Sequence, residues 1–192
     1  HGYVTYAVPG PAPGTSTWYW GPQVRVGLPQ RAITVGQVPS TNVIGDVSFS
    51  ADANEAIRID GQSTDRATGR VFSVKTLPPT RIPLAAEPLW PGSARVQRTV
   101  KAGTSMTGTL ARAQAEVDAS ADTVTATGKL DGARYGAALR PRGLVGLRGA
   151  GWRHDGDWYV RSVEHTWQPG SWTQDFTLVR DGFGSLVPAV RP

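Results

Sequence analysis

The sequence predicts a mainly β protein of the α+β class, built from closed or stacked antiparallel strands with one helix. Three observations support this fold class. The segment 143–184 contains three short apolar runs separated by turn residues. Apolar and polar residues alternate in short runs through most of the chain before it, as in half-buried strands. Only one segment shows apolar residues at helical spacing, so we expect a sheet with one helix laid across it.

The three C-terminal strands are predicted from their alternation and from the turns between them. The turn sequences are His154-Asp155-Gly156-Asp157 and Gln168-Pro169-Gly170-Ser171, which supply the backbone freedom and side-chain caps of tight connections. The strands are expected at Leu144 to Arg148, Trp158 to Trp167 and Trp172 to Arg180. Neither face of the middle strand is purely apolar, so both faces are expected to contact something.

The first part of the chain is also predicted to be β. Pro9 to Gly14 is rich in proline and must form an extended loop. The expected strands are 1–8, 24–28 with 33–38 as its hairpin partner, 43–50, a short one around Ile57 and Ile59, and 71–77. A polar loop is expected between Gly61 and Gly69.

A proline-rich segment divides the chain in this prediction. Within residues 78–104, five prolines lie between positions 78 and 91, which favours a semi-rigid linker. A helix is expected from Ser105 to Ala119, with Met106, Leu110, Ala113 and Val117 on one face and Ser105 or Thr104 as its cap. A strand at 123–130 follows. The predicted domains are therefore 1–77 and 105–184, joined by the linker 78–104 and followed by a tail, 185–192.

Composition limits the classes of function. The chain has 192 residues, no cysteine and a formal charge of +5, with its arginines scattered singly. It therefore has no disulfide or thiolate metal site, no run able to span a bilayer, and no basic cluster of the kind that reads nucleic acid. The default compartment of synthesis is the cytoplasm. The start at His1, without an initiator Met, suggests that a further segment preceded it.

Candidate catalytic and metal-binding residues do not form a convincing site. His154, Asp155 and Asp157 are better explained as a turn. Glu164 and His165 are neighbours on a strand and point to opposite faces, so they cannot converge on one ion. The sequence also lacks a G-x-S-x-G elbow and a phosphate or dinucleotide loop. No catalytic, cofactor or metal site is expected, and the chain is not expected to be an enzyme.

Seven tryptophans leave two functions open. In a β protein they more often fill the core or a subunit interface, which is the interpretation favoured here. The alternative is a carbohydrate-binding or cell-wall-binding β module. Its stacking surface would be formed by Trp18, Trp20, Trp152, Trp158 and Trp172.

Four motifs carry a resemblance to a known family. They are G-x-L-D-G-x-R-Y at Gly128 to Tyr135, R-P-R-G-L-V-G-L-R-G-A-G at Arg140 to Gly151, Y-V-x-S-V-x-H at Tyr159 to His165, and T-Q-x-F-T-L-x-R at Thr173 to Arg180. Together with segments near the start, they make the whole chain resemble the phage late control protein D family. This family forms the baseplate hub of contractile tails and related injection systems.

The resemblance implies a structural role. Such hubs are homotrimers of tube-like β-barrel domains, and their ring adapts the sixfold inner tube to the trimeric spike. The implied partners are the chain itself, a spike or tip protein, the first inner-tube ring protein and other baseplate proteins. Assembly would take place in the cytoplasm, after which the chain would belong to the virion or injection particle.

The resemblance also suggests where the polar residues of the C-terminal strands lie. We expect these three strands to form one tube-like barrel with the helix outside it. The candidate interface or lumen residues are Arg148, Trp158, Arg161, Glu164, Trp167, Trp172, Asp175 and Arg180.

Overall fold

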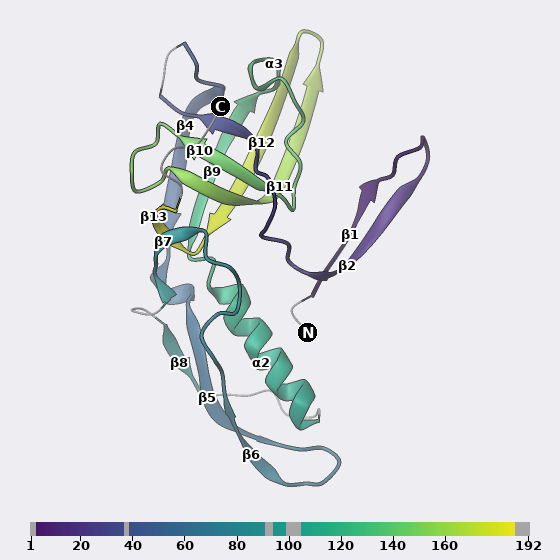
Figure 1. Cartoon of the computed structure of the whole chain (residues 1–192), viewed down its shortest axis with the longest axis vertical. Helices are drawn as coiled ribbons and strands as arrows, with labels where there is room; N and C mark the ends of the chain where they lie inside the picture. Colours follow the sequence, from purple (N-terminus) through teal and green to yellow (C-terminus); the bar gives the residue numbers. More distant parts are fainter. Residues whose placement is uncertain (1–2, 37–38, 91–93, 99–104, 187–192) are drawn as a thin grey trace.

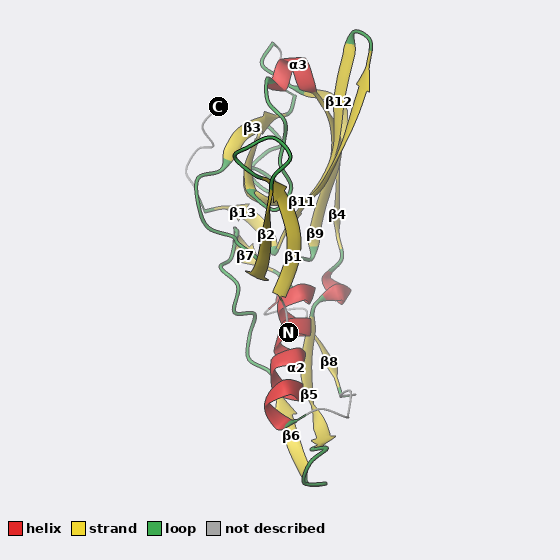
Figure 2. Ribbon diagram, turned by 90° about the vertical axis from the view of Figure 1, so that its right-hand side faces the viewer, coloured by secondary structure: helices red, strands yellow, loops and turns green. Residues whose placement is uncertain are grey.

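The computed structural model describes residues 3–36, 39–90, 94–98 and 105–186. These residues form a curled six-stranded sheet, a long helix packed on a small sheet, and a hairpin that projects from the side (Figures 1 and 2). The mainly β fold with one long helix is therefore confirmed. Two strand pairs, β3 with β10 and β5 with β8, are parallel, whereas an antiparallel arrangement was expected.

The six-stranded sheet has the order β3-β10-β11-β12-β9-β4. Its strands are β3 Gln30–Thr34, β4 Val43–Ala51, β9 Val124–Asp131, β10 Leu144–Arg148, β11 Gly156–Gln168 and β12 Ser171–Arg180. The three C-terminal strands pair consecutively and antiparallel, as predicted from the glycine-containing turns between them. The short helix α3, Gly132–Tyr135, follows β9 and begins with the Asp131 side chain accepting bonds from Ala133 N and Arg134 N.

The sheet curls into a half-barrel around one apolar core. Trp158, Leu130, Leu147 and Leu178 are completely buried in it. The pairing of β11 with β12 shifts between Val160 and Ser162, which is a β-bulge. Bulges bend and twist a strand. Residues of β11 before the bulge are mostly buried. Those after it are mostly exposed and form a long hairpin with β12, in which Gln174 and Phe176 are buried.

Asn42 connects the two edges of this half-barrel. Its side-chain Oδ1 accepts a hydrogen bond from Thr34 N at 2.9 Å, and its Nδ2 donates to the Ala32 carbonyl at 3.0 Å. Its backbone N–H also donates to Thr34 O at 3.2 Å, and its carbonyl accepts from Asp131 N at 2.9 Å. Asn42, which directly precedes the edge strand β4, thus connects the opposite edge strand β3 with the end of β9.

The helix α2, Met106–Ser120, packs against a separate small sheet. Its start is capped by Ser105, as predicted, and Ala113 and Val117 lie buried against Ile59 and Val74. The small sheet has the order β6-β5-β8, with β5 Ile57–Thr64, β6 Val71–Lys75 and β8 Arg95–Gln97, and the 3₁₀ turn η1, Ala53–Glu55, precedes it. The helix lies outside the half-barrel, as predicted, but its apolar stripe is covered by β5 and β6 of the small sheet and not by the strands of the half-barrel (Figure 1).

Two of the described strands, β7 and β8, lie in the segment that was predicted to be a proline-rich linker. β7, Ala85–Pro88, pairs antiparallel with β13, Gly182–Ser185, immediately after β12. The sequence suggested a linker without elements here. Strand pairing also crosses this segment, because β3 and β4 precede it and lie in one sheet with β9 to β12. Residues 91–93 and 99–104 of the expected linker, and 187–192 of the expected tail, lie outside the described residues.

The chain begins with a hairpin that pairs with no other strand in the described sheets. β1, Tyr3–Pro9, and β2, Ser16–Pro22, are joined by the predicted proline loop. Residues 23–29 are irregular, so the strand predicted at 24–28 is wrong, as is its hairpin with 33–38. β3 instead pairs in parallel with β10, and residues 37–38 lie outside the described part. We call the hairpin, residues 3–22, the arm.

Candidate interaction surfaces

The arm has one aromatic face that is open to solvent. Cross-strand register places Thr5 opposite Trp20 and Ala7 opposite Trp18, so these side chains share a face. Trp18 is 70% exposed and Trp20 is 68% exposed. Tyr3 meets Trp20 edge to face, with ring centroids 4.9 Å apart. We call this surface the tryptophan face.

The opposite face of the arm is partly covered. Tyr6 and Tyr19 lie opposite each other with ring centroids 5.0 Å apart. The Arg142 guanidinium lies over the Tyr6 ring at 6.0 Å, and Tyr19 Oη donates to the Pro22 carbonyl at 2.7 Å. Burial is the main reason that the pKa of Tyr6 is raised. This face therefore contacts the body, and the tryptophan face looks away from it.

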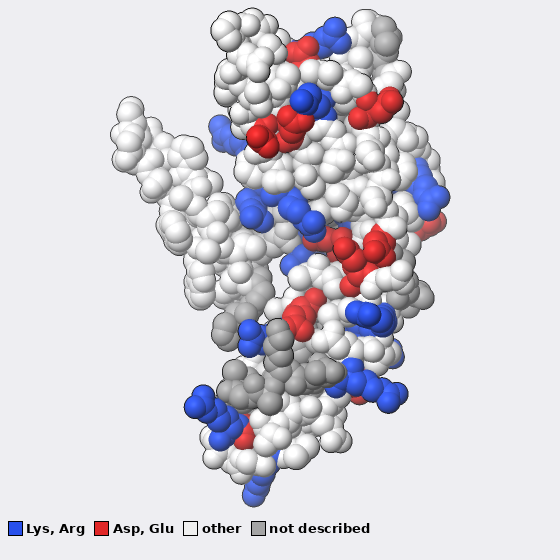
Figure 3. Space-filling view, turned by 180° about the vertical axis from the view of Figure 1, so that it is seen from behind, with Lys and Arg blue, Asp and Glu red and all other residues white. Residues whose placement is uncertain are grey.

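The arm carries no charged side chain. The first Lys, Arg, Asp or Glu of the chain is Arg25, beyond the end of β2. Figure 3 shows the arm as a white projection beside a body on which acidic and basic groups alternate. An uncharged, aromatic surface that projects into solvent is typical of an interaction site.

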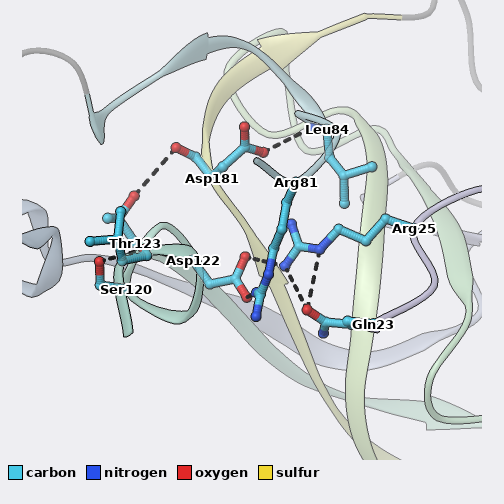
Figure 4. Close-up of polar contacts among 9 residues, drawn as sticks. Gln23, Arg25, Arg81, Leu84, Ser120, Asp122, Thr123 and Asp181 are labelled. Carbon is cyan, nitrogen blue, oxygen red and sulfur yellow. Dashed lines mark hydrogen bonds and ion pairs between the residues drawn. The ribbon is translucent and has the colours of Figure 1, made fainter. Parts of the chain in front are cut away.

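A buried charge network holds the segment that follows the arm. Arg25, which is 5% exposed, forms an ion pair with Asp122 just after helix α2, and Arg81 of the proline-rich segment pairs with the same carboxylate at 3.2 Å (Figure 4). Gln23 accepts from Arg25 at 3.4 Å. Burial lowers the pKa of Arg81, and the neighbouring charge of Arg25 acts in the same direction. The network joins three segments that are far apart in sequence.

Asp181 belongs to the same region. Its carboxylate accepts a hydrogen bond from Leu84 N at 2.9 Å, and its carbonyl accepts from Thr123 Oγ1 at 3.4 Å (Figure 4). Burial raises the pKa of Asp181, while the bond from Leu84 opposes this shift. The end of β12 is thereby tied to the proline-rich segment and to the start of β9.

An apolar cavity of about 300 Å³ lies beside this network. We call it the proline cavity. It is lined by Arg25, Pro78, Pro79, Arg81, Ile82, Pro83, Pro88, Trp90, Ala121 and Asp181. Its walls are therefore mostly proline rings and apolar side chains, together with two arginines and one aspartate.

A second aromatic surface lies on the β11–β12 hairpin. Trp167 stacks on Trp172 with ring centroids 4.3 Å apart and planes 10° from parallel, and His165 stacks on Trp172 at 6.3 Å. The other side of Trp172 lies on Gly132, where any Cβ would collide with the indole. Trp167 is 67% exposed. These two predicted interface residues are therefore brought together at one site.

Two other predicted interface or lumen residues, Trp158 and Arg180, are completely buried within the chain. They cannot line a lumen or contact a partner, so this part of the prediction was wrong. Arg180 donates to the carbonyls of Gly182, Asp155 and Arg153 at 3.0, 3.0 and 2.8 Å, and its guanidinium lies 4.4 Å over the Trp158 ring. Burial lowers the pKa of Arg180 to about 10.

The remaining predicted residues lie at the surface in different places. Glu164 is exposed opposite Asp175 on the hairpin, and Asp175 pairs with Lys129 at 3.4 Å. Arg161 is exposed next to the bulge. Arg148 is half-buried, donates to Thr34 Oγ1 at 2.8 Å, and lines an open cavity of about 560 Å³ together with Arg31 and Arg134.

The turn around His154 is structural, as predicted. The backbone N–H groups of His154 and Asp155 donate to Gly151 O, and Asp155 Oδ1 accepts from Ala150 N at 2.8 Å. The His154 ring stacks on Phe49 with centroids 4.0 Å apart. Burial is the main cause that lowers the pKa of His154, and Arg180 and Arg153 act in the same direction.

Within the described ranges, no three His, Asp or Glu side chains gather in a group that could hold a metal ion. No described helix is long and apolar enough to cross a membrane.

Sequence reasoning missed the main surface. It favoured core or interface positions for the tryptophans without singling out the arm. Trp158 is completely buried in the core, and Trp18, Trp20, Trp152 and Trp167 are more than 60% exposed, where an interface stays a prediction. The signal that could have identified the arm was the absence of charge from residue 2 to residue 24. The Arg25–Asp122 pair left no local signal, because its partners are 97 positions apart.

Comparisons with known proteins relate this fold to phage tails. No family model matches the chain, and no curated protein matches its sequence. Among solved structures, the 43 kDa tail protein of prophage MuSo2 from Shewanella oneidensis superposes with a TM-score of 0.58 at 11% identity, over 94% of this chain and 51% of that protein. The tail protein of Neisseria meningitidis MC58 gives 0.56 at 15% identity, over 95% of this chain and 52% of that protein.

The fold is thus one that occurs in phage tail proteins. The chain spans about half the length of the two tail proteins that it matches.

Proposed function

We propose that this chain is a structural component of a phage tail or of a related contractile injection particle. The observation that carries the proposal is the shared fold: two tail proteins match nearly the whole described chain, through the curled sheet and the helix with its small sheet. A fold alone does not imply function. The four sequence motifs that resemble the late control protein D family suggested the same class, although no family model matches the chain.

Within that class, we propose the role of baseplate hub. The chain would assemble as a homotrimer that connects the sixfold inner tube to a trimeric spike, and it would contact a spike or tip protein, the first tube ring and other baseplate proteins. The long β11–β12 hairpin and the arm supply projecting surfaces suited to such contacts. No catalytic role is part of this proposal.

Imaging of the assembled particle tests the hub role. The density for this chain is expected in one layer between the tube and the spike, with three copies per particle. Six copies in that layer, or a position on the sheath, would contradict the hub role but agree with the broader proposal that the chain is a tail component. Absence from purified particles would contradict both.

A carbohydrate-binding module is the second candidate, and the exposure of Trp18 and Trp20 is the observation in its favour. The five tryptophans proposed for a sugar platform do not form one, because Trp158 is buried in the core and Trp172 is covered by Trp167 and Gly132. Quenching of indole fluorescence by cell-wall oligosaccharides, lost when both Trp18 and Trp20 become alanine, would support this candidate over the hub.

A further inference from the structure

The chain carries two apolar features that match each other in chemistry. One is the tryptophan face of the arm, and the other is the proline cavity. The indoles of the arm are 70% and 68% exposed, so they do not fill the cavity of their own chain. Figure 1 shows the arm extended away from the rest of the molecule.

The proline cavity suits a flat, uncharged aromatic group. Pro78, Pro79, Pro83 and Ile82 give it apolar walls, and its volume of about 300 Å³ is within the range of ligand pockets. Proline rings offer rigid surfaces, so little side-chain entropy is lost when an aromatic ring packs against them.

The charges around the cavity are balanced. Arg25 and Arg81 share the carboxylate of Asp122, and the Asp181 carboxylate lies on the cavity wall. An uncharged occupant would leave this balance unchanged. The arm carries no charge, and the guanidinium groups of the lining arginines would stack favourably on an indole.

We propose that the tryptophan face of one copy docks into the proline cavity of a second copy of this chain. The proposal rests on the proposed function in one respect, namely that copies assemble side by side. Two copies can exchange arms reciprocally about a twofold axis, or the contact is heterologous, in which case repetition closes into a ring or continues as an open chain. Tryptophan is the residue type most enriched among the dominant contacts of protein interfaces.

Cysteine cross-linking tests the contact directly, because the full chain contains no cysteine of its own. Two single variants, Ala7→Cys and Ile82→Cys, are purified, mixed and treated with a short bismaleimide. Ala7 lies opposite Trp18 on the tryptophan face, so both indoles are kept. Ile82 is 54% exposed on the cavity wall, so its replacement leaves the core intact. The mixture is expected to give a heterodimer band several-fold stronger than either variant alone.

The matched control places the thiol on the other face of the same strand. Val8 neighbours Ala7 but lies opposite Thr17, away from the tryptophans. Val8→Cys mixed with Ile82→Cys is expected to give only the background of random collisions. Equal yields for the Ala7→Cys and Val8→Cys mixtures would overturn the proposal.

Sedimentation velocity of the full chain supplies a second readout. Trp18→Ala with Trp20→Ala is expected to shift the protein from oligomer to monomer with an unchanged far-ultraviolet circular dichroism spectrum, since both indoles are exposed. A wild-type monomer, or a double variant as large as the wild type, would overturn the arm contact. If the wild type is a trimer and the double variant remains one, the arm contact is contradicted but the hub role is not. If cross-linking gives open chains of variable length, the arm contact is supported and a trimeric hub is contradicted.

Discussion

Asp122 is the residue at which three parts of the chain meet. Its carboxylate pairs with Arg25 below the arm and with Arg81 in the proline-rich segment, and its own backbone lies between α2 and β9. It is 5% exposed. A carboxylate in this position is costly to remove, because two guanidinium groups then lose their partner in a region of low dielectric.

Replacement of this carboxylate by an amide is expected to destabilise the fold strongly. For Asp122→Asn, the free energy of unfolding should fall by about 3–5 kcal/mol, as for other buried pairs that lose one partner. The control is Asp175→Asn, which removes the exposed pair with Lys129 and should cost about 1 kcal/mol or less. Urea unfolding followed by tryptophan fluorescence measures both. Equal losses would show that the network around Asp122 contributes no more than a surface pair.

His154 gives the fold a pH dependence of known sign. Its pKa is lowered in the folded state, so below the unfolded value of about 6.5 the unfolded chain binds the proton more readily. Stability should therefore fall as the pH drops through about 6.5, and level off below the folded pKa. Thermal unfolding between pH 5 and 8 measures this slope. His154→Phe keeps the stack on Phe49, and it should flatten the slope. A slope that His154→Phe leaves unchanged would contradict this role of His154.

At the scale of elements, strands with local turn signals were predictable and those without were not. Leu144–Arg148 matches its predicted range, and α2 differs from its prediction by one residue at each end, because glycine turns and a serine cap mark their limits. β7 was missed because its neighbouring prolines indicate a linker. β7 is a strand because it pairs with β13, which lies almost a hundred positions away in the sequence. The alternation of apolar and polar residues does not show which distant segments pair.

The pairing of β7 with β13 depends on one glycine. A Cβ on Gly182 would collide with the Glu87 carbonyl and lie 2.7 Å from Pro88 Cα, both in the backbone of β7. Gly182→Ala should therefore cost about 1–3 kcal/mol, as other overpacking substitutions do, and should expose the amides of 84–89 to hydrogen exchange. Gly143→Ala is the control, since its Cβ would meet only the flexible end of Gln30. Unchanged protection in Gly182→Ala would show that β7 is held by other contacts.

At the scale of the whole molecule, the fold class could be predicted but the assembly of its parts could not. The sequence correctly indicated a β-rich chain with one helix. It did not show that the helix covers β5 and β6, because the same apolar stripe of Ala113 and Val117 fits any flat apolar surface. The sequence prediction also placed Trp158 and Arg180 at an interface or lumen. It failed for Arg180 because a buried arginine that donates to three carbonyls has the same sequence pattern as an exposed one.

The arm is expected to be dispensable for folding. The core of the half-barrel contains no arm residue among those described, and the arm meets the body through Tyr6 and Arg142. A chain that starts at Gln23 should therefore unfold with a free energy within about 0.5–1 kcal/mol of the full chain. Urea unfolding followed by circular dichroism measures the difference. A loss comparable to that of Asp122→Asn would mean that the arm is part of the folding unit.

Asn42 has a consequence for how this chain can vary through evolution. The half-barrel is joined across its edges at Asn42, whose backbone N–H donates to Thr34 and whose amide side chain supplies one further donor and one acceptor in the spacing of a peptide group. The connection between β3 and Asn42 can therefore change in length without altering the circumference of the sheet. Position 42 itself has no such freedom, because an aspartate there would set a carboxylate against the Ala32 carbonyl. Among distant homologues, length variation should gather just before this residue, and the asparagine should stay.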